Sequence, residues 1–232
     1  MKARAFEFRH RSLLNLIHFW IAFQLYSVDH RNVVWAVVGR SEHGVLLLRV
    51  VLALGALLVA LAAAIRTWAA AYLRSSVVHD PTLHAEALVA DGPYRHVRNP
   101  LYLGTFLMSI GLGLLASRSG FVVLALGAAI RILRLIGREE AELAAQQGEV
   151  FREFCRRVPR LWPSLRARIP ASGAKALWGQ AFRGEAHLWG FFITMLAFAV
   201  TLDRRVLWIL GGASLGLWLL ARAAERLKPA TA

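Results

Sequence analysis

One apolar run, residues 45–73, constrains the fold of this chain more than any other feature. It reads VLLLRVVLALGALLVALAAAIRTWAAAYL and exceeds the roughly 20 residues with which a helix crosses the hydrocarbon core of a membrane. Five other apolar segments follow the same pattern, and the first is the weakest because it contains Asn15, His18 and Gln24. The sequence therefore predicts six membrane-spanning helices, at about residues 12–28, 45–73, 101–117, 120–137, 186–202 and 205–222.

Composition narrows the fold class in the same direction. Hydrophobic residues make up 57% of the 232 residues, and the mean hydropathy of +0.49 is too high for an ordinary soluble domain. No strand-like alternation of apolar and polar residues is present. We therefore expect an all-α, polytopic membrane helical bundle embedded in the lipid bilayer. Cys155 is the only cysteine, so no internal disulfide is possible, and no Cys/His spacing typical of a metal site occurs.

The basic charge of the chain predicts its orientation. The formal net charge is +14, which nucleic-acid-binding proteins share, but here the charge accompanies long apolar runs. If the six segments alternate from an inner N-terminus, 22 of the 28 Lys and Arg residues lie on the inner side. This bias is typical of cytoplasmic loops. We expect both termini in the cytoplasm, an inner (cytoplasmic) membrane location in a bacterial cell, a retained first helix rather than a cleaved signal peptide, and no nucleic-acid partner.

Two polar clusters flank the third and fourth apolar segments. The first includes GPYRHVRNPLYLG at residues 92–104, and the second follows residue 131 and includes EEAELAAQQGEVFREFCRRVPRLWP. Only RSG, residues 118–120, separates the two segments, which predicts an antiparallel hairpin with both clusters at the inner surface. Tyr94, Arg98, Asn99 and Tyr102 should then lie near Arg131, Arg134, Glu139 and Glu140.

The chemistry of these side chains predicts a cofactor pocket at the cytoplasmic face. Pro100 suits the first turn of a helix, whose free N–H groups favour a carboxylate. Tyr94 and Tyr102 offer faces for a planar base or a cation, and Glu139 and Glu140 offer negative charge. S-adenosylmethionine, with its carboxylate, amine, purine and sulfonium, would use all of these groups. Arg131 and Arg134 also suit a simpler role as arginines that reach toward the headgroups from inside the bilayer.

Taken together, the two clusters resemble the isoprenylcysteine carboxyl methyltransferases and the related phospholipid N-methyltransferases. The family pattern has Gly-x-Tyr, Arg-His-Pro-x-Tyr-x-Gly, a helical hairpin, Glu-Glu-x-x-Leu, Phe-Gly and Val-Pro-Arg. The resemblance covers about residues 79–163. Asn99 stands where the family has histidine, and Gln147 stands where it has the phenylalanine before Gly148.

The resemblance implies S-adenosylmethionine as the cofactor and assigns residues to it. The family's substrate arginine aligns with Leu135, so either Arg134 or Arg131 would take that role, and Glu140 would support Glu139. These three, Arg134, Arg131 and Glu140, are the expected catalytic residues. The expected cofactor-binding residues are His79, Leu88, Val89, Tyr94, Arg98, Asn99, Pro100, Leu101, Tyr102 and Glu139.

The expected activity is methyl transfer to a lipophilic acceptor that enters from the bilayer. An isoprenylcysteine-type carboxylate and a lipid amine both fit, and the oligomeric state is open. We divide the chain into N-terminal helices (1–73), a methyltransferase core (74–165) and a connector with a C-terminal hairpin (166–232). Within the last part, residues 164–180 are basic and suit either a connector on an anionic leaflet or a plain linker.

Two other functions remain open at this point. Steroid-reductase-like membrane enzymes share an Arg-x-Pro-x-Tyr-x-Gly loop and bind NADPH, but they usually end in Tyr-Pro-x-x-Arg, where this chain has Glu-Glu and VPRLWP. A non-enzymatic membrane scaffold is the other alternative. The retained tyrosine and glutamate pairs favour the methyltransferase.

Overall fold

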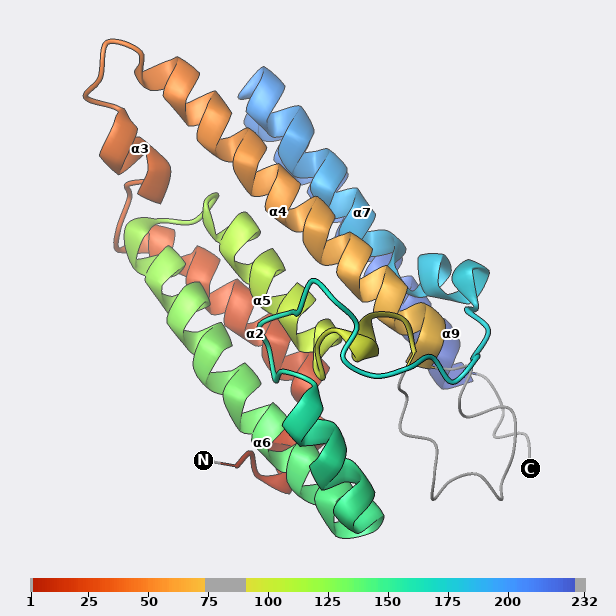
Figure 1. Ribbon diagram of the computed structural model, residues 1–232. Helices are drawn as coiled ribbons and strands as arrows, with labels where there is room; N and C mark the ends of the chain where they lie inside the picture. Colours follow the sequence, from red (N-terminus) through yellow and green to blue (C-terminus); the bar gives the residue numbers. More distant parts are fainter. Residues whose placement is uncertain (1, 74–90, 228–232) are drawn as a thin grey trace.

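A computed structural model describes residues 2–73 and 91–227, which form an all-α protein. Figure 1 shows the helices running roughly along one direction, with α5 between two groups. The α-helices are α1 (Ala5–Arg9), α2 (Arg11–Gln24), α3 (Val33–Val38), α4 (Gly44–Leu73), α5 (Pro100–Gly113), α6 (Arg118–Arg157), α7 (Trp178–Thr201), α8 (Arg204–Val206) and α9 (Gly212–Leu227). Shorter helical turns are the 3₁₀ segments η1 (Leu25–Ser27) and η2 (Gly92–Arg95) and the π-helical segment η3 (Leu207–Gly211).

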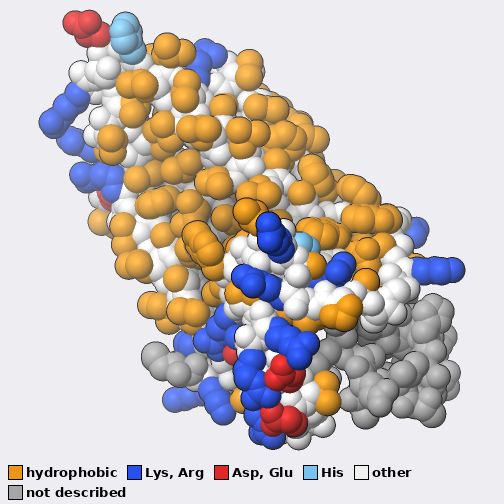
Figure 2. Space-filling model, viewed as in Figure 1, with side chains coloured by type: hydrophobic (Ala, Val, Ile, Leu, Met, Phe, Trp, Pro, Cys, Tyr) orange, Lys and Arg blue, Asp and Glu red, His pale blue; other side chains and the backbone are white. Residues whose placement is uncertain are grey.

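Each of the six predicted segments contains a helix, and three of the helices are long and apolar enough to cross a membrane. These three are α4, α6 and α7. The first segment ends at η1, and α3 is a separate short helix. The sixth predicted segment is interrupted by the π-helical segment η3. Figure 2 shows a broad apolar surface along the molecule, with charged side chains at its two ends and most of them at the lower end, as expected of a protein embedded in lipid.

The helices pack in a sequence that leaves α5 in the middle. Helix α6 packs on α2 and α5, α5 packs on α4, and α7 packs on α4 and α9. Small residues allow the close approach of α5 to α4, because a Cβ added at Gly111 would lie only 2.7 Å from Val59 Cγ2 and 2.8 Å from the Gly55 carbonyl oxygen. Such small-residue contacts are a common way for helices to associate in membranes.

The hairpin of α5 and α6 is confirmed, but its turn is not the one predicted. Residues 118–120 form the first turn of α6, where the Ser117 hydroxyl accepts a hydrogen bond from the Gly120 N–H. The connection is residues 114–117. Asn32 holds it by donating to the carbonyl oxygens of Leu114 (2.9 Å) and Ala116 (3.1 Å). A serine cap begins the helix earlier than the apolar pattern suggests.

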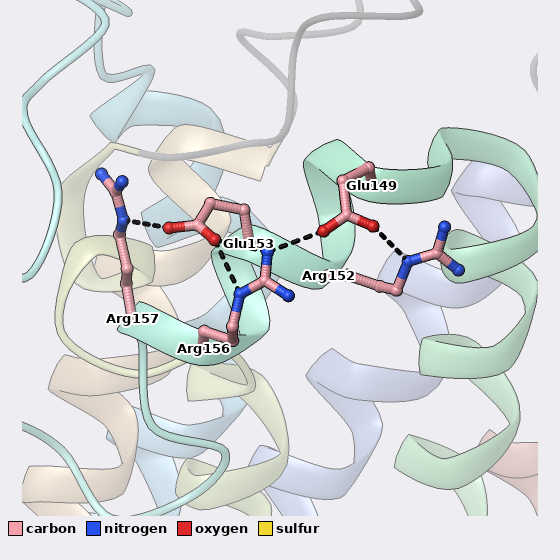
Figure 3. Close-up of polar contacts among 5 residues, drawn as sticks. All are labelled: Glu149, Arg152, Glu153, Arg156 and Arg157. Atoms are coloured by element: carbon pink, nitrogen blue, oxygen red, sulfur yellow. Dashed lines mark hydrogen bonds and ion pairs between the residues drawn. The ribbon is translucent and has the colours of Figure 1, made fainter.

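Helix α6 continues well past the predicted end of the fourth segment and bends at Gly148. Its φ of 57° and ψ of −124° lie in a region that glycine adopts without strain. After this bend, Phe151 and Phe154 pack against Leu143 and fold the last turns back. On the outer face of these turns, Figure 3 shows Glu149 and Glu153 paired with arginines from the same segment. These arginines are Arg152, Arg156 and Arg157.

The contact of α2 with α6 provides a test of this packing. A Cβ added at Gly120 would meet the Ala22 carbonyl oxygen well inside van der Waals contact. We therefore expect Gly120→Ala to lower the free energy of unfolding by about 1–3 kcal/mol, the usual range for overpacking. The control is Gly184→Ala in α7, where the added methyl meets nothing within 4 Å. Thermal unfolding in detergent measures both, and equal stability of the two variants would contradict the close approach.

Candidate functional site

The polar loop before α5 is held in one conformation by glycine and aspartate. Gly92 has φ 56°, and an added Cβ there would collide with the ring of Tyr72. The Asp91 carboxylate accepts hydrogen bonds from Ser172 N (2.8 Å), Ser172 Oγ (2.6 Å) and Ala174 N (2.7 Å). Burial of Asp91 opposes its ionisation, but these hydrogen bonds outweigh burial and keep its pKa below the ordinary value. The loop therefore presents the Tyr94 side chain in a fixed position.

The hairpin brings this loop and the first turn of α5 against the second half of α6. Tyr102 Oη donates a 2.8 Å hydrogen bond to Glu139 Oε1. The Asn99 amide lies 3.5 Å from Glu140 Oε1 and donates to the Arg160 carbonyl oxygen at 3.0 Å. The structure therefore brings the two polar clusters together as predicted: Tyr102 contacts Glu139, and Asn99 lies beside Glu140.

Glu140 is the centre of a separate ion-pair network. Arg98 Nη2 lies 3.2 Å from Glu140 Oε1, and Arg160 Nη2 lies 2.8 Å from Glu140 Oε2. Arg98 also donates to the Cys155 carbonyl oxygen at 2.8 Å. Because both carboxylate oxygens are engaged by arginines, Glu140 joins the loop, α6 and the segment that follows α6. The geometry is that of a side chain that supports its neighbours.

Arg131 and Arg134 of α6 were both expected near the polar loop, but they contact different parts of the protein. Arg131 lines the cavity described below and donates to Asn15 Oδ1 of α2. Arg134 is absent from the cavity wall and pairs with Glu7 of α1, with Nη2 2.7 Å from Glu7 Oε1. Hydrogen bonding to Arg134 lowers the pKa of Glu7, which keeps this pair charged at neutral pH.

A cavity of about 1660 Å³ runs between the two helix groups, with this polar cluster at one end. It is larger than the roughly 300–1,000 Å³ of a typical small-molecule site, so it has room for two molecules. Every predicted site residue within the described part of the chain lines it, except Arg134. Its middle is apolar, with walls from Phe19, Phe23, Leu48, Leu52, Met108, Leu112, Leu188, Phe191, Met195 and Phe198.

Four buried polar atoms on the cavity wall have no hydrogen-bond partner among the described residues. They are Tyr94 Oη, Arg98 Nε, Arg131 Nη1 and Gln147 Oε1. Burial raises the pKa of Tyr94, so its hydroxyl stays protonated and able to donate. Buried polar groups are normally satisfied, so this concentration at one end of a cavity points to a polar ligand.

Sequence reasoning missed a partly buried ion pair beside the cavity. Arg66 of α4 pairs with Glu185 of α7, with Nε–Oε2 at 2.9 Å and Nη2–Oε1 at 3.0 Å, and also donates to Thr105 Oγ1 at 2.8 Å. The pair thus joins α4, α5 and α7. Its signal in the sequence was an arginine within the longest apolar run and the only acidic residue between Glu153 and Asp203.

The cofactor contacts expected before the loop cannot be compared with the structure. His79, Leu88 and Val89 lie outside the described residues. Among the residues that are described, no group of three or more His, Cys, Asp and Glu side chains is placed to hold a metal ion.

The Asp91 contacts predict a measurable change in the polar loop. Asp91→Ala removes the acceptor of the Ser172 and Ala174 amides, so we expect their hydrogen exchange, and that of the Tyr94 segment, to become faster. Asp203→Ala is the matched control, because Asp203 accepts from the Arg205 N–H in α8. Unchanged exchange in Asp91→Ala would show that the contacts do not hold the loop.

The same anchor should respond to pH with a defined sign. The folded-state pKa of Asp91 is lowered, so its stabilising contribution is present above the ordinary value of 3.8 and is lost as pH falls through the lowered pKa. We expect Ser172 and Ala174 protection, corrected for intrinsic exchange, to be constant from neutral pH to about pH 4. A loss of protection near pH 6 would assign the anchor to a different group.

Comparisons with known proteins match a region that contains most of this site. Residues 50–148, which run from α4 to the bend at Gly148, match the phospholipid methyltransferase (PEMT) family. The cobalt-zinc-cadmium resistance protein CzcN of Cupriavidus metallidurans is 34% identical over 156 residues, covering 62% of this chain and 68% of the relative. The nickel-cobalt-cadmium resistance protein NccN of Alcaligenes xylosoxydans xylosoxydans is 30% identical over 160 residues, covering 68% and 71%. No solved structure matches. The chain is therefore a member of the phospholipid methyltransferase family.

Proposed function

We propose that this protein transfers a methyl group from S-adenosylmethionine to a lipophilic acceptor in the membrane. The observation that carries the proposal is the Tyr102–Glu139 pair beside buried polar atoms that have no partner among the described residues, at one end of a cavity whose middle is lined by apolar side chains. This end suits a polar, charged cofactor, and the apolar middle of the cavity suits a hydrocarbon chain. Membership of the phospholipid methyltransferase family supports the same reading.

The residues at the polar end fit the parts of this cofactor. When bound, S-adenosylmethionine supplies an electrophilic methyl group on a positively charged sulfur. The Glu139 carboxylate, which the Tyr102 hydroxyl orients, offers the negative charge that a sulfonium or ammonium needs. The Tyr94 hydroxyl and the Gln147 amide oxygen offer unused hydrogen-bonding atoms. The free N–H groups at the start of α5, where Pro100 lies, suit a carboxylate.

Arg131 is the arginine that we assign to the acceptor. It lines the cavity and keeps one guanidinium nitrogen, Nη1, without a partner among the described residues, whereas Arg134 is engaged by Glu7. A guanidinium with free donors can orient a carboxylate or phosphate. The main task of the protein would be to hold acceptor and donor in line while water is excluded, and positioning of this kind supplies much of the rate in group transfer. Glu140, held by two arginines, would keep Glu139 in place.

The proposed membrane arrangement makes α2, α4, α5, α6, α7 and α9 the six spans, with both termini in the cytoplasm. Helix α5 is about 21 Å long at 1.5 Å per residue, shorter than the hydrocarbon core. Its ends are covered by the polar loop and by the turn at residues 114–117, which lie within the protein. The acceptor would reach the cavity from the bilayer and the cofactor from the cytoplasm.

Ligand binding tests the cofactor assignment and separates it from the reductase alternative. We expect calorimetry of the detergent-purified protein to show binding of S-adenosylhomocysteine and none of NADPH. Tyr102→Ala should abolish the binding, because it removes the ring and the hydrogen bond to Glu139. Binding of NADPH alone would favour a reductase, and binding of neither ligand to the folded protein would favour a non-enzymatic role.

Two charge substitutions on α6 separate binding from structure. We expect Glu139→Gln to weaken S-adenosylhomocysteine binding about tenfold or more, the effect of losing a hydrogen bond or charge contact worth ~1.5–3 kcal/mol. Arg134→Ala is the control: it should lower thermal stability through the lost Glu7 pair and leave binding unchanged. If Arg134→Ala weakened binding as much as Glu139→Gln does, the assignment of these residues would be wrong.

A further inference from the structure

The segment that joins α6 to α7 is tied closely to the polar loop. This segment, residues 159–177 and here called the strap, has no regular secondary structure. Its backbone is bonded to the loop by Arg98 N to Pro159 O, Ser164 N to His96 O and Arg168 N to Arg95 O, each 2.9 Å. The His96 ring adds a 2.8 Å hydrogen bond to the Ser164 carbonyl oxygen. The strap therefore has a fixed course over η2, and the direction of its side chains is set by these bonds.

Two large apolar side chains of the strap are directed away from the protein. Trp162 is 85% exposed and Leu165 is 99% exposed, with Pro163 and Ser164 between them. A segment that is held by so many hydrogen bonds has little freedom to turn these side chains inward. Two large exposed apolar side chains within four residues of a fixed segment indicate a surface that meets something apolar.

The strap is also basic and has no acidic residue. Between Glu153 and Glu185 the chain has no Asp or Glu and has seven basic residues, namely Arg156, Arg157, Arg160, Arg166, Arg168, Lys175 and Arg183. Arg156 and Arg157 are used by the glutamates of α6 (Figure 3), and Arg160 is used by Glu140. Arg166, Arg168 and Lys175 are exposed and have no acidic partner among the described residues.

The strap lies where the apolar surface of the protein ends. In Figure 1 it crosses the front of the molecule at the ends of α4 and α5, and in Figure 2 basic side chains gather at this place, directly below the broad apolar surface. Trp178, which follows the strap, is 46% exposed at the start of α7. Exposed tryptophan beside arginine and lysine is the composition found at the boundary between hydrocarbon and headgroups.

We propose that the strap is a membrane-docking surface, with Trp162 and Leu165 inserted into the adjacent leaflet and Arg166, Arg168 and Lys175 bound to anionic headgroups. Apolar anchors combined with basic side chains give membrane attachment that depends on anionic lipid. Because the strap is bonded to η2, its attachment also fixes the loop that carries Tyr94 and Arg98. This inference goes beyond the proposed function, since it does not depend on what the cavity binds.

Lipid quenching of a single fluorescent label tests this surface. In a Cys155→Ala background, Leu165→Cys is labelled with an environment-sensitive fluorophore and reconstituted into vesicles that contain acyl-chain-brominated lipid. Gln146→Cys, an exposed position on α6, is the matched control. We expect the label at position 165 to be quenched several-fold more than the label at 146, and more strongly when phosphatidylglycerol replaces part of the phosphatidylcholine. Trp162→Cys is a second labelling site if the first variant folds poorly.

The charge part of the proposal has its own test. Combined Arg166→Gln, Arg168→Gln and Lys175→Gln should remove the extra quenching given by phosphatidylglycerol and leave thermal stability in detergent unchanged. Retention of the phosphatidylglycerol effect in this variant would overturn the headgroup contacts. Quenching of positions 165 and 162 by aqueous iodide, at the level of position 146 in both lipid mixtures, would overturn the docking surface itself.

Discussion

The hydrogen bond between Tyr102 and Glu139 depends on the hairpin of α5 and α6, and most of the candidate site depends on that hairpin too. The two residues are 37 positions apart, and only a tight antiparallel turn brings the first turn of α5 against the second half of α6. Asn32 fixes the turn from the opposite end of the bundle, and Gly111 allows α5 to lie close to α4. If α5 shifted by one turn along α6, about 5.4 Å, Tyr102 would lose Glu139 and the network around Glu140 would lose Arg98.

A good part of this arrangement was accessible from the sequence because it follows from chain topology. Apolar run lengths located the helices, and a short connection required an antiparallel pair whose polar ends meet. This reasoning predicts Tyr94, Asn99, Tyr102 and Glu139 around one pocket, and all four line the cavity. It failed on the turn itself, since the Ser117 cap extends α6 over residues that were expected to be the loop.

The rest depended on contacts with distant elements, which periodicity does not report. Arg131 and Arg134 are three positions apart on α6, so they share a similar face, yet one meets the cavity and the other meets Glu7 of α1. The choice is set by where α1 packs, and α1 has only five residues and a weak signal. In the same way, the sequence around Arg66 does not predict Glu185 as its partner, because the two residues lie on helices that are far apart in sequence. Among the described helices, α2, α5 and α9 are also shorter than the three that could cross a membrane on their own.

The Arg66–Glu185 pair has a consequence for the order in which the protein is made. Glu185 is synthesised 119 residues after Arg66, and Ser172, which binds Asp91, appears 81 residues after its partner. Until those residues are made, Arg66 has no acidic partner and Asp91 lacks the Ser172 groups that bind it. The region that matches the family ends at Gly148, before either partner exists. The segment after α6 and helix α7 therefore complete contacts of the core rather than being added to a finished one.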